Sequence, residues 1–470
     1  MKIYDRLYGE LKFPSIILDL LSCPGLLRLR DVRMANNQFV AFPAFASASR
    51  YEHSLGVCYL AGLCAKSLRL PEKESIELMM ACLYHDVGTP PFAHAMEEVL
   101  QAEFGFDHEQ NLKNLIMGTT GEFDGDMARI FQDEGLKLRS VCHSKKGRAF
   151  GLDLYRIAKI AAGDKDELLS PLLNSNEMDL DNIDNIVRAS SAMGLIQLED
   201  IKLASRLAHA FIFENKQIFY DGNYINDIRK WQQIRDIQYT AIFDSVDDFS
   251  YQTMIKKALH LLMKDNNASP RIDRNSWKLT DSSIVHDYLL NNPKSHEIMR
   301  RVLLCKPFHC LGILYVQGNG VSKYINLNLD EIEHIASDYF IKTLDVKQKK
   351  LDSVYTNAVV ANFYPDKRKR RLQSKAISWS METVIDEVAD IPEGSLLGLF
   401  TPFTNSNHKE VAEIDGGTAR KSVSFRGDNL NKLIQILTDS TLKGFGVSVY
   451  GSDSDGRPDT NATGYQLELF

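Results

Sequence analysis

The sequence of 470 residues contains no apolar run that approaches the ~18 residues needed to cross a membrane. Its first residues, MKIYDRLYGELKFP, interleave charges too often for the apolar region of a signal peptide. The net charge of −7 shows no basic excess, which argues against a general nucleic-acid binder. These absences predict a cytoplasmic protein that has no membrane partner.

Cysteine is also scarce, with seven residues, an odd number, and no CxxC pair. This pattern argues against a disulfide framework and against a thiolate metal site. Cys58, Cys64 and Cys82 lie within apolar helical patterns, where a thiol behaves as a small core residue. We therefore expect buried, reduced thiols, as in a reducing compartment. The GxSxG and HExxH motifs of other hydrolases are absent as well.

Histidine, in contrast, is concentrated in one stretch. Of twelve histidines, four lie between residues 53 and 108, each with polar or acidic neighbours: His53, His85, His94 and His108. A His-Asp dipeptide alone carries little information, because chance produces about one in a chain of this size. His286–Asp287 is a second such pair, without other histidines nearby, and we interpret it as a helix-surface pair.

Apolar periodicity divides the chain into two parts. The pattern is helical to about residue 310, and the remainder contains short apolar runs that predict strands: LGILYVQGNG, GSLLGLFTPF and GFGVSVYGS. We expect a mainly α protein with an all-helical core at 1–310 and a smaller α+β portion at 311–470, in which the tail from Gly451 to Gly464 is expected to be mobile. Later helices are expected at 196–214, 224–264, 282–304, 379–389 and 428–442.

Polar residues of the histidine-rich stretch fall near predicted helix ends. A helix after Pro71 should stop at Gly88, which puts His85 and Asp86 in its last turn. Neighbouring helices add polar residues at helical spacing: His94 and Glu97 at 92–104, His108 at the start of the next, and Asp181, Asp184, Asn185 and Arg188 on one side of a later helix.

Four of these side chains have the chemistry of a metal site. His53, at the head of an apolar helix, can approach His85 and Asp86, and Asp181 could complete the set. Two imidazoles and two carboxylates suit a divalent ion such as Mn, Mg, Fe or Zn, and leave positions open for water and substrate. By themselves, the residues leave open the alternative of four unrelated polar side chains at helix ends.

The order of these motifs resembles that of a known family. SRYEHSLGVCYLA, CLYHDVGTPPFAHAMEE, FDHEQN and DLDNIDNIVRAS form a series of H, HD, PFxHxxE, HEQ and D. In this the chain resembles the HD-domain deoxynucleoside triphosphate (dNTP) triphosphohydrolases, which are dGTPase-like, and most of all the branch that contains the vertebrate protein joining a SAM and an HD domain. The likeness covers about residues 1–310. It implies a helical HD core and hydrolysis of a dNTP to a deoxynucleoside and inorganic triphosphate.

Carried over by position, the resemblance also implies roles for individual residues. The implied metal ligands are His53, His85, Asp86 and Asp181, the catalytic residues His94, Glu97 and His108, and the substrate-binding residues Arg50, Asn185 and Tyr239. His94 or His108 can pass a proton to the leaving oxygen while Glu97 holds the imidazole tautomer. Arg50 offers a planar fork to phosphate oxygens.

The chain departs from the branch at several positions. Asn182 and Asn185 stand where the branch has a lysine and a tyrosine, and Thr89 stands where a histidine is common. Ala189 replaces an acidic residue, and Met34 replaces a glutamine on the sugar and base side. Three basic residues compete for the place of one arginine near the triphosphate: Arg229, Lys230 and Arg235. These changes put the preferred nucleotide in question, whereas the metal and proton-transfer residues are retained.

The resemblance further implies allosteric homo-oligomers activated by a regulatory nucleotide, and by analogy dNTP depletion in antiviral or anti-phage defence. Two alternatives stay open: an HD nucleotidase or phosphodiesterase for mono- or cyclic nucleotides, and a catalytically inactive nucleotide sensor. We interpret the basic run Lys367–Arg371 as a solvated loop or strand edge, with phosphate or nucleic-acid binding as the alternative.

Overall fold

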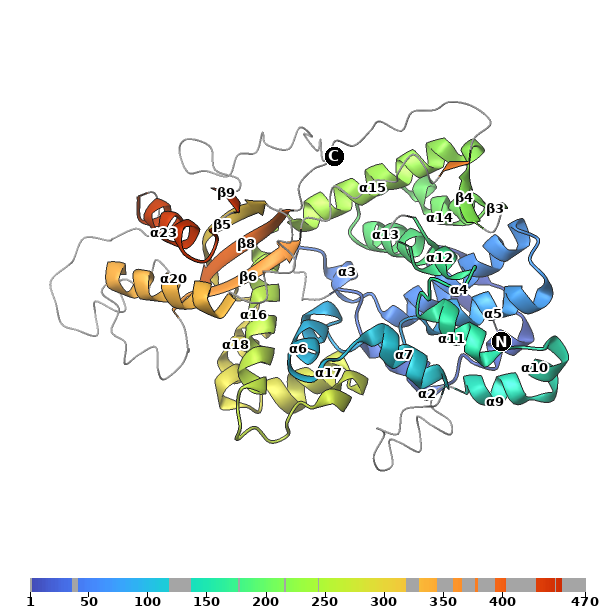
Figure 1. Cartoon of the computed structure of the whole chain (residues 1–470), viewed down its shortest axis with the longest axis horizontal. Coiled ribbons are helices and arrows are strands. Elements are labelled where there is room, and N and C mark those ends of the chain that lie inside the picture. Colours follow the sequence, from blue (N-terminus) through green and yellow to red (C-terminus); the bar gives the residue numbers. More distant parts are fainter. Residues whose placement is uncertain are drawn as a thin grey trace. The chain divides into compact units, whose positions relative to one another are not determined.

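Two units interleave along the chain in the computed structural model (Figure 1). The first comprises residues 1–242, 266–291 and 368–388, and the second 243–265, 292–367 and 389–470. The division into domains at 1–310 and 311–470 stays a prediction. The structure describes residues 2–35, 41–117, 137–175, 178–214, 217–243, 245–317, 329–344, 358–365, 377–378, 394–402, 428–443 and 445–449.

The first unit is built mainly from helices. Its α-helices are α1 (Ser15–Leu18), α2 (Pro24–Arg28), α3 (Pro43–Ala46), α4 (Arg50–Ser67), α5 (Glu72–Tyr84), α6 (His94–Phe104), α7 (His108–Met117), α9 (Leu138–His143), α10 (Lys145–Phe150), α11 (Leu154–Ala161), α12 (Ser170–Leu173), α13 (Leu180–Ala192), α14 (Leu203–Leu207), α15 (Ile225–Phe243) and α17 (Asp281–Ser283). Shorter turns of helix are η1 (Leu29–Asp31), η3 (Leu198–Lys202), η4 (Gly222–Tyr224), η5 (Arg274–Lys278) and the π-helical η6 (Ile284–Leu289).

The strands of this unit are short. β1 (Ile3–Asp5) and β2 (Gly9–Leu11) form an antiparallel pair, while β3 (Phe211–Glu214), β4 (Gln217–Asp221) and β7 (Ile377–Ser378) form a small sheet in the order β3-β4-β7. The prediction of helix at 196–214 was therefore wrong at its end. Phe211 and Ile212 pair with Tyr220 and Phe219 across a hairpin, a partnership that helical periodicity does not detect.

The centre of the first unit is the packing of α4 against α5 and α13, with α11 against α5 and α7. α4 begins because the Ser49 side chain accepts a hydrogen bond from the backbone N–H of Glu52, and α13 begins at Asp179 in the same way. Leu60 and Met80, from α4 and α5, are fully buried. This packing holds the first turns of α4 and α13 close to the end of α5.

The second unit combines an antiparallel sheet with helices. The sheet has the order β6-β8-β5-β9, and its core includes Leu314, Ile332, Phe340, Leu397 and Leu433. Its elements are α16 (Val246–Met263), α18 (Pro293–Leu303), β5 (His309–Gln317), α20 (Leu329–Leu344), β6 (Val360–Pro365), β8 (Gly394–Thr401), α23 (Asp428–Asp439) and β9 (Gly446–Val449).

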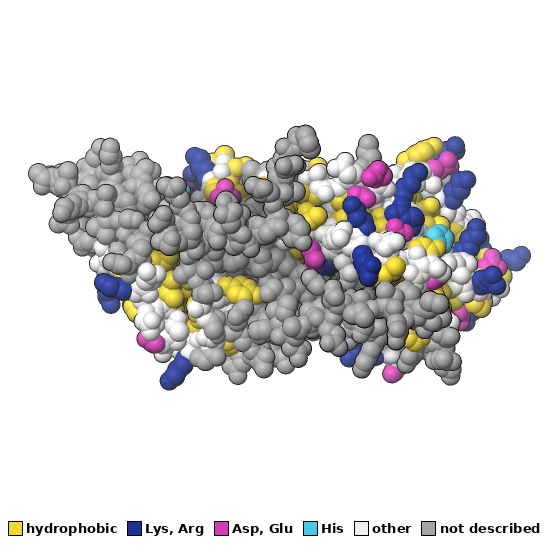
Figure 2. All heavy atoms as spheres, turned by 90° about the horizontal axis from the view of Figure 1, so that it is seen from above, with side chains coloured by type: hydrophobic (Ala, Val, Ile, Leu, Met, Phe, Trp, Pro, Cys, Tyr) yellow, Lys and Arg dark blue, Asp and Glu magenta, His cyan; other side chains and the backbone are white. Residues whose placement is uncertain are grey.

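The mainly α fold class is confirmed, as is the presence of both helices and strands in the C-terminal part of the chain. The three expected strands are β5, β8 and β9, whereas β6 was not predicted from the sequence. The tail from Gly451, the helix at 379–389 and the basic run Lys367–Arg371 lie outside the described residues. Within the described part, no helix is long and apolar enough to cross a membrane. On the face seen in Figure 2, the coloured Lys and Arg side chains are interspersed with Asp and Glu.

All seven cysteines are free thiols, and Cys58, Cys64 and Cys82 are buried as predicted. Burial raises the pKa of each of these three thiols, so they stay protonated. The control pair also agrees with its interpretation, because His286 and Asp287 are exposed.

Candidate metal centre

Segments far apart in the chain bring the four predicted ligands together. His53 comes from α4, His85 from the turn after α5, and Asp181 from α13, and one ligand atom from each lies within 4.8 Å of the others. His53 Nε2 is 2.7 Å from Asp181 Oδ1, and His85 Nε2 is 3.7 Å from the same oxygen. Asp86 Oδ2 lies 3.6 Å from His85 Nε2 and 3.9 Å from His53 Nε2. The helix α5 ends at Tyr84, so His85 and Asp86 follow it rather than form its last turn.

Two buried atoms of this cluster have no hydrogen-bond partner: His85 Nε2 and Asp86 Oδ2. The other ring nitrogen of His85, Nδ1, lies 2.7 Å from the carbonyl oxygen of Cys82, which accepts a hydrogen bond from it; in the neutral imidazole the lone pair is then on Nε2. A buried polar atom without a partner costs about 1–3 kcal/mol. A divalent cation among these nitrogens and carboxylate oxygens would satisfy both atoms, so the residues fit a metal such as Mn, Fe, Zn or Mg.

A buried ionic network holds His53 from the side opposite the cluster. His53 Nδ1 is 2.8 Å from Asp184 Oδ1, and Asp184 accepts hydrogen bonds from Arg188 Nε and Nη2 at 2.8 and 3.0 Å. Tyr8 donates to Asp184 Oδ2 at 2.6 Å, and Arg188 Nη1 donates to Asp5 Oδ2 at 2.9 Å. Burial alone would raise the pKa of Asp184, but Arg188 and His53 hold it well below its usual range. The carboxylate on Nδ1 thus turns Nε2 of His53 toward the cluster.

Sequence reasoning missed this network. It placed Asp184 and Arg188 on the polar side of a helix, yet the exposed fraction of both side chains is 0%. Gly56 makes room for them, because a Cβ there would lie 2.1 Å from Asp184 Oδ2 and 2.4 Å from Arg188 Nη2. The i, i+4 Asp–Arg spacing was the available signal, but it is equally typical of a solvated helix face.

Asp86 is oriented by two further side chains. Its Oδ1 accepts hydrogen bonds from Arg50 Nη1 at 2.6 Å and from Thr89 Oγ1 at 2.9 Å, which leaves Oδ2 for the cluster. Burial would raise the pKa of Asp86, but the charges of Arg50 and the nearby histidines hold it well below its usual range. Thr89, where the resemblance leads one to expect a histidine, therefore supports the carboxylate directly.

The predicted proton-transfer residues also meet. His94 is the first residue of α6 and His108 the first of α7, and both contact Glu97 through Nδ1, His94 at 3.2 Å. Burial alone would lower the pKa of His108 and raise that of Glu97. Their mutual hydrogen bond and charges outweigh burial, so that the pKa of His108 is raised and that of Glu97 falls to about 2. The carboxylate thus favours the protonated form of His108.

The candidates for substrate contact differ in their exposure and in their partners. Of the three competing basic residues, Arg229 is exposed, Lys230 pairs with Asp200 at 3.4 Å, and Arg235 is buried. The guanidinium of Arg235 lies 4.7 Å from the ring centroid of Tyr239, a cation–π contact.

The two asparagines of α13 differ in their surroundings. Asn182 Nδ2 donates to both carboxylate oxygens of Asp179, at 3.1 and 2.9 Å, and so serves the helix cap. Asn185 is half-buried. Asn182, where the resemblance leads one to expect a lysine, therefore has a local structural role.

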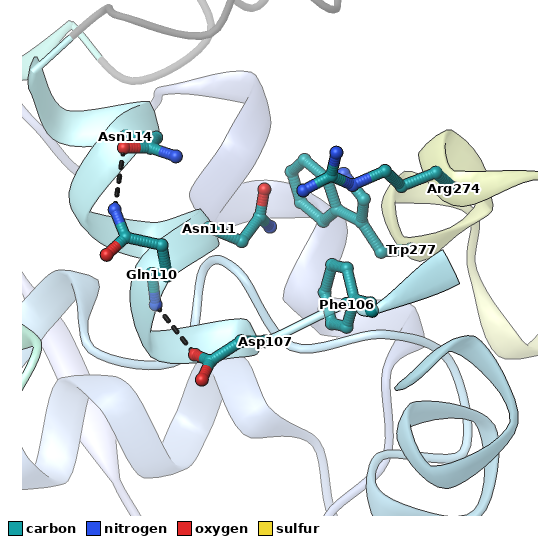
Figure 3. Close-up of a pocket in the computed structure, with 8 residues that line it drawn as sticks. Phe106, Asp107, Gln110, Asn111, Asn114, Arg274 and Trp277 are labelled. Carbon is teal, nitrogen blue, oxygen red and sulfur yellow. Dashed lines mark hydrogen bonds between the residues drawn. The ribbon is translucent and has the colours of Figure 1, made fainter. Parts of the chain in front are cut away.

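A small cavity lies beside the start of α7 (Figure 3). Its volume of about 50 Å³ holds only a few water molecules at about 10–15 Å³ each, and is too small for a nucleotide. Phe106 and Asn111 line it together with Arg274 and Trp277 of η5. Since η5 also packs against α6, the cavity marks where η5 meets the helices that carry His94 and His108.

Comparison with known proteins agrees with this geometry. Residues 50–186 match the family model of the HD domain. The chain is 30% identical over 207 residues to the deoxynucleoside triphosphate triphosphohydrolase SAMHD1 homolog of Dictyostelium discoideum, which covers 41% of this chain and 36% of that protein. It is 31% identical over 119 residues to the SAMHD1 enzyme of Bos taurus, covering 23% and 20%. The matches thus span well under half the length of these relatives.

A solved structure supports the fold. A hypothetical protein from Aquifex aeolicus matches with a TM-score of 0.58 and 18% sequence identity, covering 88% of this chain and 99% of that one. Within the HD segment, the described residues contain helices and no strand.

Proposed function

Since the chain contains an HD domain and is similar to SAMHD1-type enzymes, we propose that it is a metal-dependent phosphohydrolase that converts a dNTP to a deoxynucleoside and inorganic triphosphate. The observation that carries the proposal is the pair of buried, unpartnered atoms, His85 Nε2 and Asp86 Oδ2, which lie 3.6 Å apart beside two further ligand side chains. Both atoms lie in the cluster without a hydrogen-bond partner, as expected of metal ligands.

In this proposal His53, His85, Asp86 and Asp181 hold one divalent cation. When bound, the cation polarises the α-phosphoryl group and lowers the pKa of a water molecule toward 7. Burial lowers the pKa of His53, but Asp181 and Asp184 raise it to about 10. Binding of the cation therefore releases a proton, and metal affinity should fall as the pH is lowered.

The pair of His108 and Glu97 supplies the proton that hydrolysis requires. A water oxygen forms a bond to the α-phosphorus, the bond from that phosphorus to the 5′ oxygen breaks, and the 5′ oxygen takes a proton from the donor. The water loses one proton to the solvent, which restores the proton of the donor before the next turnover. His108 is the proposed donor, because Glu97 raises its pKa and orients it through Nδ1, leaving Nε2 to reach the substrate. His94, which contacts the other oxygen of Glu97, is the second candidate donor.

Arg50 has a hydrogen-bond donor that can bind the phosphates of the substrate. One of its terminal nitrogens is paired with Asp86, while its Nε is buried and has no partner. A triphosphate oxygen can satisfy Nε, and the guanidinium then offsets part of the charge of the substrate. Asn185 and Tyr239 remain the proposed contacts on the sugar and base side, with Arg235 as the second phosphate-binding candidate.

The resemblance to SAMHD1-type enzymes also supports regulation by a nucleotide, assembly into homo-oligomers and dNTP depletion in antiviral or anti-phage defence as extensions of the proposal. A cytoplasmic location belongs with them. For the defence role, the test is phage sensitivity, which should rise in cells that lack the intact protein.

The proposal is tested by turnover of the four dNTPs, singly and in pairs, with Mn or Mg. We expect inorganic triphosphate and a deoxynucleoside as products, and stimulation in pairs if a nucleotide activates. Orthophosphate as the only phosphorus product would contradict the proposal and favour a nucleotidase. Tight nucleotide binding without any hydrolysis would identify a sensor.

A further inference from the structure

A segment distant in sequence is hydrogen-bonded to the loop between the proposed metal ligands and the proposed proton-transfer histidines; we call it the gripping segment. The loop, residues 87–93, follows Asp86 and leads into α6, which begins at His94. The gripping segment, residues 274–281, comprises η5 and the first residue of α17 and belongs to the same unit. The contacts between the two run through Asp281 and Arg28.

Asp281 holds the end of the loop. Its Oδ1 accepts a hydrogen bond from the backbone N–H of Phe92 at 2.9 Å, and its Oδ2 accepts one from the backbone N–H of Arg33 at 3.0 Å. The residue is 3% exposed, so water does not substitute for these donors. Burial raises the pKa of Asp281 to about 6, which leaves the carboxyl ionised at neutral pH and able to accept both bonds.

The backbone at this point is in an unfavourable conformation. Phe92 has φ +53° and Ala93 has φ +46°, both in the left-handed region that residues with a Cβ rarely adopt. Such a conformation persists only where the surroundings hold it, and these positions often lie at functional sites. His94 follows directly, and its Nδ1 contacts Glu97. The direction in which the chain enters α6 therefore decides where the imidazole of His94 lies.

Arg28 holds the start of the loop. Its guanidinium donates to the carbonyl oxygens of Val87 and Thr89 at 3.0 and 2.7 Å. It also donates to the carbonyl oxygens of Trp277 and Leu279 at 3.1 and 2.8 Å. One side chain thus joins the loop to the gripping segment, next to the Asp86 that carries a ligand oxygen.

We propose that Asp281 is a positioning residue, which holds the Phe92–Ala93 backbone in the conformation that aligns His94 and Glu97 with the metal ligands, while Arg28 anchors the other end of the loop. Asp281 touches neither metal nor substrate, so its loss should lower kcat without emptying the metal site. This inference rests on the proposed function for its kinetic part only, because the state of the loop can be measured without any substrate.

The test compares D281N with D273N in the full chain. Asparagine at 281 has the same shape as aspartate. Its NH2 group, however, is a donor and would face one of the two backbone N–H groups that the carboxylate accepts hydrogen bonds from. Asp273 is a matched control, because it caps η5 in the same segment through the N–H of Asn275 and is exposed. The measurements are hydrogen exchange of the backbone over residues 87–97, metal content, and kcat and KM for the dNTP that the wild type hydrolyses.

For D281N we expect faster exchange of the Phe92 amide, metal content equal to that of the wild type, a kcat at least about ten-fold lower and a KM within about two-fold. D273N should match the wild type in all of these. Unchanged exchange and kcat in D281N would overturn the proposal, as would a kcat that falls only in proportion to lost metal.

The wild type supplies a measurement that does not depend on any variant folding. The Phe92 amide should be protected from exchange, and exchange at the rate of an exposed amide would overturn the proposal. If no dNTP is hydrolysed, protection of Phe92 still tests the grip on the loop, so failure of the inference and failure of the proposed function are distinguishable.

Discussion

His53 and Asp184 are separated by 131 positions in the chain and meet at 2.8 Å, imidazole Nδ1 to carboxylate oxygen. The contact joins the first turn of α4 to α13, and it turns the other nitrogen of His53 toward the candidate metal centre. Because Asp184 is itself bound by Arg188 and Tyr8, the orientation of one ligand depends on a network that reaches the N-terminal hairpin.

The first prediction concerns this network. D184N keeps the shape of the side chain but removes the charge that orients His53 and pairs with Arg188. We expect metal affinity to fall by about 10–100-fold, with a loss of stability because Arg188 is left in a buried site without its main partner. Metal titration by calorimetry and thermal unfolding measure the two effects. Wild-type metal affinity in D184N would show that the network is structural only.

A glycine substitution tests the same network from the other side. In G56A the new Cβ would lie 2.1 Å from Asp184 Oδ2, so the ion pair must shift and both metal content and melting temperature should fall. G62A in the same helix is the matched control, because its nearest contact, Met79 Cε at 3.4 Å, is ordinary packing. There, alanine should be neutral or stabilise the helix by about 0.5–1 kcal/mol. Equal behaviour of the two variants would rule out the close approach at Gly56.

The ligand assignment is tested by the two His-Asp pairs of the chain. D86A should abolish metal binding and turnover, because it removes a ligand oxygen and leaves Arg50 without its partner. D287A changes the exposed aspartate of the second pair and should retain both. Metal content by mass spectrometry separates the two. Chelation should likewise lower the melting temperature of the wild type but not that of D86A. A full metal complement in D86A would refute the assignment.

The role of Glu97 predicts a change in pH dependence. Glu97 raises the pKa of His108, so the protonated donor persists to higher pH than an ordinary histidine of pKa near 6.5. In E97Q this support is lost, the pKa of His108 falls, and the alkaline limb of the kcat profile should move to lower pH. E103Q, an exposed change on the same helix, should leave the profile in place. An alkaline limb unmoved in E97Q would exclude His108 as the proton donor.

Local patterns predicted much of the fold. Apolar spacing placed α5 and α6 to within a few residues, and short apolar runs closed by glycine or proline predicted β5, β8 and β9. The failures came where a partner decides the structure. Phe211–Glu214 forms a strand because it pairs with Gln217–Asp221, and β6 completes a sheet whose other strands are far away in the chain.

The sequence by itself determined which chemistry the chain carries. The order of its histidine and aspartate motifs indicated two imidazoles and two carboxylates near helix ends, and the family resemblance carried by the same motifs implied a histidine–glutamate group for proton transfer. That information is local, because helix ends and motif spacing depend on neighbouring residues.

Only the tertiary structure decided how these groups are held. The burial of Asp184 and Arg188 against Gly56 and the hydrogen bond from Phe92 to Asp281 across 189 positions are contacts between segments that meet after folding. The sequence pattern around a polar residue on a helix is the same whether its side chain faces water or a buried ion pair. Its environment is set by the packing of other helices against it, and the residues next to it in the sequence do not specify that packing.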